Sequence, residues 1–96
     1  MNKYTENIQK ILQENFKPEV IEVFDQSRAH AGHAEAQKSG GGHYEVVIVS
    51  KKFVGKRLLE RHRMVYEVLA KEMKSGIHAL KITTMTKEEW KNNLIT

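Results

Sequence analysis

The 96-residue chain contains no cysteine, one proline, one tryptophan and a single aspartate, Asp25. Without thiols it forms no disulfide and offers no thiolate nucleophile or CxxC redox pair. It also builds neither a thiolate zinc site nor an all-thiolate iron–sulfur site of its own. Any metal must therefore be held by nitrogen or oxygen ligands, or by sulfur that another molecule supplies.

Long apolar runs are missing as well. No run approaches the roughly 20 apolar residues that a membrane-spanning helix needs, and the first ten residues are polar and include Glu6, unlike a secretory signal or an acid-poor transit peptide. We therefore expect a cytoplasmic protein without membrane contact. With 40% hydrophobic and 29% charged residues, the chain has the balance of one globular domain, residues 1–96.

Motifs of catalysis are not found. The chain has no GxxxxGK[ST], HExxH or GxSxG pattern, and nothing in its spacing positions a catalytic triad. A zinc hydrolase built only from histidines could draw on His30, His33, His43 and His78, but it is not expected, because no spacing beyond the HxxH of His30 and His33 supports it. We expect that the protein is not an enzyme.

Positive charge is concentrated in one segment. The net charge is +4, but residues 51–63 alone hold six basic residues and one acid, Glu60, whereas the rest of the chain holds 10 basic and 11 acidic residues. The basic residues are Lys51, Lys52, Lys56, Arg57, Arg61 and Arg63. Such a segment is a candidate surface for an anionic partner, and solvated charge around a helix start is the alternative interpretation.

The first half of the chain predicts a helix and two strands. Apolar residues at helical spacing predict a helix over 3–16, which Pro18 ends. Residues 20–24 and 43–50 are rich in β-branched and aromatic residues and predict an antiparallel pair of strands. The connection over 26–42 has no periodicity and is long for a compact domain, which makes it the first place to look for function.

The second half predicts two helices, a strand and a terminal helix. A helical stretch runs from Gly55 to Ser75, and a bend near Glu60 would split it into a short and a long helix. Residues 78–84 alternate as a strand, and Thr86 with Glu89 forms a capping box that begins the last helix.

The expected element order is therefore αββααβα. A strand–helices–strand crossover is right-handed, so the third strand should lie parallel to the second. The fold class is α+β, a mixed three-stranded sheet with helices packed on one face.

The chemistry that the chain does offer comes from five histidines: His30, His33, His43, His62 and His78. His62 occupies the apolar stripe of its helix and is interpreted as a residue at the edge of the core. His43 begins a strand and is interpreted as solvent-facing. His78 opens the third strand on the face of its apolar residues, so its side chain should point toward the helix layer or its rim.

Several separate motifs resemble those of the BolA family. They are VIVS (47–50), FxGK (53–56), LxRHRMVY (59–66), LAxEM (69–73), IHAL (77–80) and TxxxW (86–90). The resemblance extends over about the whole chain, and the spacing between the motifs agrees. It implies a class II KH-like fold, in agreement with the element order.

The resemblance also implies a function. BolA-like proteins partner monothiol glutaredoxins in iron–sulfur cluster assembly and trafficking and in iron-linked regulation, as heterodimers that share a [2Fe-2S] cluster. The family histidine that opens the last strand corresponds to His78, and the second ligand comes from the long loop, where His30 matches and His33 competes.

The ligand count agrees with this implication. A [2Fe-2S] cluster needs four ligands, and histidine replaces cysteine on one iron in Rieske centres. Two imidazoles fill half of that shell, so a glutaredoxin with bound glutathione must supply the thiolates. We expect a monomer that binds no cluster alone.

The alternative function is that of a DNA-binding transcriptional regulator, a role linked in the family to stress. It would use the basic segment 51–63, with Arg61 and Arg63 at the start of the long helix of a helix-turn-helix. RNA clamping in the KH manner is not expected, because no GXXG loop lies between the two helices.

Overall fold

The computed structural model describes residues 3–26 and 42–95. Its elements, in chain order, are α1 (Lys3–Phe16), β1 (Val20–Asp25), β2 (His43–Val49), the 3-10 helix η2 (Lys51–Phe53), α3 (Leu58–Val68), α4 (Ala70–Ser75), β3 (Ala79–Met85) and α5 (Lys87–Ile95). In the described part of the chain no helix is long and apolar enough to span a bilayer.

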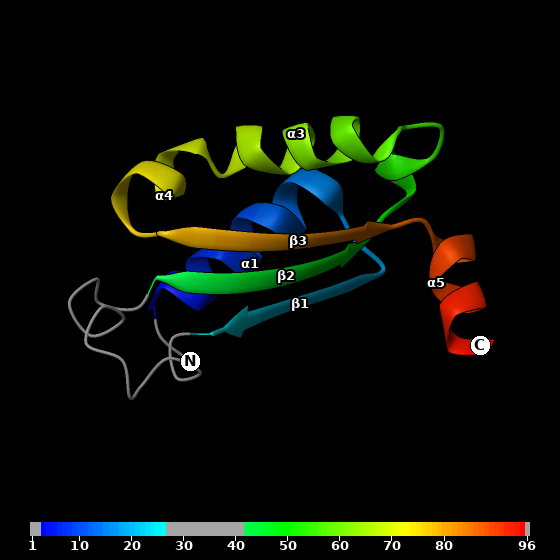
Figure 1. The fold of residues 1–96 in the computed structure, drawn as a ribbon, viewed down its shortest axis with the longest axis horizontal. Coiled ribbons are helices and arrows are strands. Elements are labelled where there is room, and N and C mark those ends of the chain that lie inside the picture. Colours follow the sequence, from blue (N-terminus) through cyan, green and yellow to red (C-terminus); the bar gives the residue numbers. More distant parts are fainter. Residues whose placement is uncertain (1–2, 27–41, 96) are drawn as a thin grey trace.

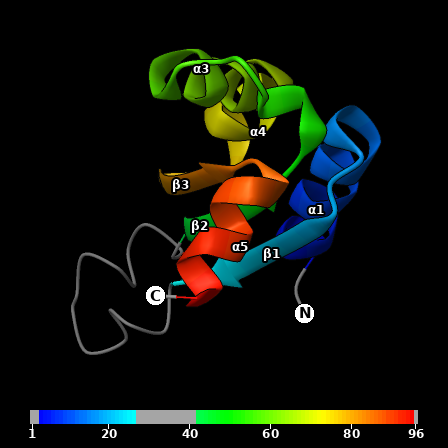
Figure 2. The ribbon, with the colours of Figure 1, turned by 90° about the vertical axis from the view of Figure 1, so that its right-hand side faces the viewer.

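The three strands form one mixed sheet in the order β1-β2-β3. Strand β1 pairs antiparallel with β2, Val20 opposite Val49, and β3 runs parallel to β2, His43 opposite Ala79. Helices α1, α3 and α4 cover one face of this sheet, while α5 lies at one end (Figures 1 and 2). The predicted α+β class and strand directions are confirmed.

The core lies between the sheet and the helices. Along α1, Ile8, Leu12 and Phe16 recur every four residues and are buried, so a single stripe of this helix faces the sheet. The ring of Phe16 packs against Phe53 with ring centroids 5.2 Å apart. The helix ends at Phe16, and the next residue, Lys17, takes a positive φ of 43° just before Pro18.

Strand β2 is the central strand and has one buried face. Tyr44, Val46 and Ile48 are buried against the helices, whereas the alternate residues His43, Glu45 and Val47 are only half-buried. Because successive side chains of a strand point to opposite faces, these three residues belong to the face that α1 and α3 leave uncovered.

The prediction of a bend near Glu60 is wrong. Helix α3 runs without interruption through this position, because Glu60 belongs to its first turn and accepts a hydrogen bond from the backbone N–H of Arg57 at 3.4 Å. The break falls at Leu69, between α3 and α4. The shorter helical piece comes earlier, as η2, where the Ser50 hydroxyl oxygen accepts from the Lys52 N–H at 3.2 Å.

Candidate functional site

The N-terminal ends of the two parallel strands meet at Gly42. Its carbonyl oxygen accepts hydrogen bonds from the backbone N–H groups of His78 at 2.7 Å and of Ala79 at 3.1 Å. Gly42 has a φ of +70°, and a Cβ added there would lie 2.9 Å from the carbonyl oxygen of Gly76 and 3.2 Å from the Cβ of His78. Glycine is therefore required at this position, both for its backbone conformation and for the close approach of the two chain segments.

This approach brings two histidines together. The ring centroids of His43 and His78 are 5.3 Å apart, and their planes are tilted by 38°. His78 is exposed and directly precedes the first residue of β3. Because His43 lies opposite Ala79, both rings lie at the same end of the sheet. The only signal of this pairing in the sequence is the glycine directly before a strand, and the interpretation of His43 as a solvent-facing strand residue missed it.

A hollow lies beside His43 at the same end of the sheet. Its volume is about 330 Å³, and His43, Glu45 and Ala79 are among the residues that line it. The carboxylate of Glu45 accepts a hydrogen bond from the Gln26 side-chain amide at 3.3 Å and forms an ion pair with Lys81 at 3.8 Å. The hollow is thus lined by one histidine and by a carboxylate that is paired with an ammonium group.

The other predicted metal ligands cannot be placed in this arrangement. His30 and His33 lie outside the described residues. His62 is half-buried on α3, as the interpretation of a core-edge residue expected. Within residues 3–26 and 42–95, no group of three or more histidine, aspartate or glutamate side chains could hold a metal ion. These residues therefore offer a histidine pair and not a complete coordination shell.

Most of the basic segment is accessible at the opposite end of the sheet, near η2 and the start of α3 (Figure 1). Five of its six basic side chains are exposed: Lys51, Lys52, Lys56, Arg57 and Arg63. Three large apolar side chains are exposed in the same segment, Val54 at 64%, Leu58 at 61% and Leu59 at 63%. The surface is therefore mixed, basic with an apolar component.

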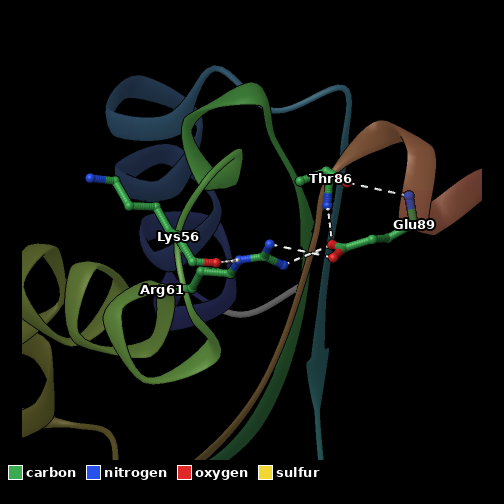
Figure 3. A network of polar contacts seen from close by, with 4 residues as sticks. All are labelled: Lys56, Arg61, Thr86 and Glu89. Atoms are coloured by element: carbon green, nitrogen blue, oxygen red, sulfur yellow. Dashed lines mark hydrogen bonds and ion pairs between the residues drawn. The ribbon is translucent and has the colours of Figure 1, made fainter.

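Arg61 does not belong to that surface. Its side chain is 10% exposed, and its guanidinium donates to both carboxylate oxygens of Glu89, at 2.7 and 3.4 Å (Figure 3). Its Nε donates to the carbonyl oxygen of Lys56 at 2.9 Å. The expectation that Arg61 presents its charge to an anionic partner is wrong, because the side chain joins the start of α3 to α5.

Glu89 is the other half of this contact. Its Oε1 accepts from the backbone N–H of Thr86 at 2.7 Å, while its own N–H donates to the Thr86 hydroxyl at 3.3 Å, which confirms the predicted capping box. The hydrogen bond from Arg61 and that from the Thr86 N–H hold the pKa of Glu89 below its ordinary value. The carboxylate is therefore stabilised in its charged form.

A mixed three-stranded sheet with helices on one face, and an exposed histidine directly before its last strand, define a small α+β domain. The model of the family described as BolA-like protein matches residues 12–89. The chain belongs to the BolA family.

Relatives from bacteria, animals and plants agree with this assignment. The chain is 41% identical over 85 residues to the DNA-binding transcriptional regulator BolA of Escherichia coli K12, covering 88% of this chain and 77% of that protein. It is 37% identical over 82 residues to mouse BolA-like protein 1, covering 85% of this chain and 57% of that protein. The solved BolA domain of SufE1 from Arabidopsis thaliana superposes with a TM-score of 0.80 at 37% identity, covering 93% of this chain and 98% of that one.

Proposed function

We propose that the protein partners a monothiol glutaredoxin and shares a [2Fe-2S] cluster with it, in the assembly or trafficking of such clusters. His78 supplies one ligand, and His30, or else His33, supplies the second. The partner and its bound glutathione supply two thiolates, which completes a shell of four. The observation that carries this proposal is the exposed position of His78 at the end of the sheet.

The donor chemistry of the chain fits such a centre. Imidazole nitrogen replaces thiolate on one iron of a Rieske cluster, so two histidines from one chain are chemically sufficient for one iron. The backbone of His78 is fixed by its hydrogen bond to Gly42, while its side chain stays exposed. A fixed, accessible ligand is what a centre shared between two proteins requires.

The test is reconstitution of the purified protein with a glutathione-loaded monothiol glutaredoxin, iron and sulfide. We expect a heterodimer whose visible absorption and circular dichroism differ from those of the glutaredoxin homodimer. His78→Ala should abolish this spectrum, and His62→Ala, a histidine change elsewhere in the fold, should not. An unchanged spectrum in His78→Ala would overturn the ligand assignment, and the absence of any heterodimer would overturn the function.

A second candidate is binding to DNA as a transcriptional regulator. Two observations favour it: five exposed basic side chains gather in residues 51–63, and the Escherichia coli relative is named a DNA-binding transcriptional regulator. Arg61 takes no part in this second proposal. The binding surface would consist of Lys51, Lys52, Lys56, Arg57 and Arg63.

This candidate predicts affinity for DNA that falls steeply with salt, because each neutralised phosphate releases counterions. Replacing four exposed residues of the segment by alanine, namely Lys51, Lys52, Arg57 and Arg63, should weaken binding and flatten the salt dependence. The control carries the same number of alanines at exposed lysines elsewhere, namely Lys10, Lys71, Lys74 and Lys91. Equal losses of DNA affinity in the two variants would show that only the net charge of the protein matters. The segment 51–63 would then have no specific role in binding.

A further inference from the structure

We infer that His43 and His78 together form a two-nitrogen chelate for one divalent transition-metal ion of the zinc class. This inference does not depend on the proposed function, since it concerns the protein alone, without a glutaredoxin. In the described part of the chain, His43 and His78 are the one pair of histidines whose imidazole rings lie against each other.

The spacing of the two rings suits a shared ion. A tetrahedral Zn²⁺ ion holds each imidazole nitrogen at about 2.0–2.1 Å, which places the centroids of two coordinated rings roughly 5 Å apart. The observed separation between the His43 and His78 centroids is 5.3 Å. The side chain of His78 is exposed, so its ring can rotate about the side-chain bonds without any movement of the strands.

The backbone holds the pair in place before any ion binds. His43 is the first residue of β2, and His78 directly precedes β3 in the parallel register that sets His43 opposite Ala79. The two hydrogen bonds to the Gly42 carbonyl fix the distance between these strand ends. Because the ligand backbones are preorganised, ion binding pays little conformational entropy beyond that of two side chains.

The surroundings of His43 also leave space for an ion. The hollow of about 330 Å³ borders His43 and leaves room for further ligands of the ion. The carboxylate of Glu45 lies on the same face of β2, two residues along, and its charge is balanced by the Lys81 ammonium at 3.8 Å. Since the described residues provide no third side-chain ligand, the remaining coordination positions are open to water or to a thiol brought from outside.

The experiment is calorimetric titration of the full chain with Zn²⁺ alone, in a buffer that does not bind metal. One ion should bind per chain. His43→Ala and His78→Ala should each lower the affinity by about a hundredfold, because losing one of two tethered ligands removes the effective concentration of the second. The control is His62→Ala, which should bind as the parent does. The loop variant, His30→Ala combined with His33→Ala, tests whether the loop histidines supply the ligands instead.

A direct readout separates coordination from misfolding. In the parent protein, Zn²⁺ should shift the imidazole proton resonances of His43 and His78 and leave those of His62 in place, while the circular dichroism of every variant matches the parent. The inference is overturned if the parent binds no Zn²⁺, if His43→Ala binds as tightly as the parent, or if only the loop variant loses binding. Failure here leaves the glutaredoxin test untouched, because that test requires a partner and sulfide.

Discussion

At the scale of single residues, two glycines share a backbone conformation but differ in their surroundings. Gly42 has a φ of +70° and Gly55 a φ of +76°, but a Cβ at Gly42 would crowd the backbone of Gly76 and His78, whereas a Cβ at Gly55 would meet nothing within 4 Å. The two positions thus separate the cost of the backbone conformation from the cost of the contact.

We predict that Gly42→Ala lowers the free energy of unfolding by more than Gly55→Ala does. Each change forces a positive φ on alanine, at a cost of about 1 kcal/mol, and only Gly42→Ala adds the steric conflict that pushes the strand ends apart. Denaturant unfolding of the two variants measures the difference. A second measurement is Zn²⁺ affinity, which should fall in Gly42→Ala and stay at the parent value in Gly55→Ala. Equal unfolding free energies for Gly42→Ala and Gly55→Ala would contradict the prediction, because they would show that the strand ends accommodate the added methyl group without loss of stability.

The sequence predicted the helices and strands better than it predicted which distant residues contact each other. Apolar spacing predicted the helix α1 and β-branched composition predicted the strand β2, because both signals are local to the chain segment. The sequence missed the pairing of His43 with His78, which depends on a register between strands 35 residues apart in numbering. It also counted Arg61 as surface charge, because its acceptor Glu89 comes from α5 and no local pattern links the two.

At the scale of elements, α5 is attached to the rest of the domain through a polar contact. The guanidinium of Arg61 lies between the Lys56 carbonyl and the Glu89 carboxylate (Figure 3). Its Cζ lies 6.0 Å from the centroid of the Phe53 ring. The sequence could predict the start of α5 from its capping box but not what α5 packs against. A charged contact in this position makes the attachment sensitive to pH.

We predict that acid weakens this attachment. The pKa of Glu89 is lowered in the folded chain, so the contact contributes its full stability above the glutamate pKa of the unfolded chain, about 4.3, and loses it as the pH falls through the lower folded value. Glu89→Gln should therefore be less stable than the parent near neutral pH, and the difference should shrink as the pH falls below about 4. Thermal unfolding from pH 7 to pH 3 measures the stability of the parent and of Glu89→Gln as a function of pH.

The control for this prediction is Glu88→Gln, one residue earlier in α5, where the carboxylate is exposed and does not meet Arg61. Its curve should run parallel to that of the parent. The prediction is contradicted if the difference in stability between Glu89→Gln and the parent stays constant down to pH 3. Glu89 would then stabilise the fold by something other than its charge. The complementary Arg61→Ala variant should lose about 1–2 kcal/mol at neutral pH through the same contact.

At the scale of the whole molecule, the histidine pair and the basic segment lie at opposite ends of the sheet. The pair stands where β2 and β3 begin, and the segment follows the end of β2. A metal centre and an anionic partner can therefore be bound without competing for the same surface. This separation allows the two proposed functions to be tested independently, by His78→Ala for the first and by the four alanines in 51–63 for the second.

The last prediction follows from the composition of the entire chain. With no cysteine anywhere in its 96 residues, the molecule supplies nitrogen ligands but no thiolate, and a [2Fe-2S] cluster needs four ligands of which histidine is attested for two on one iron. Reconstitution of the protein alone, with iron and sulfide but without thiol or glutaredoxin, should give no stable stoichiometric cluster absorption. Addition of a glutathione-loaded monothiol glutaredoxin should produce it, at one cluster per heterodimer. A stable cluster on the isolated chain would contradict the premise that its coordination shell is completed from outside.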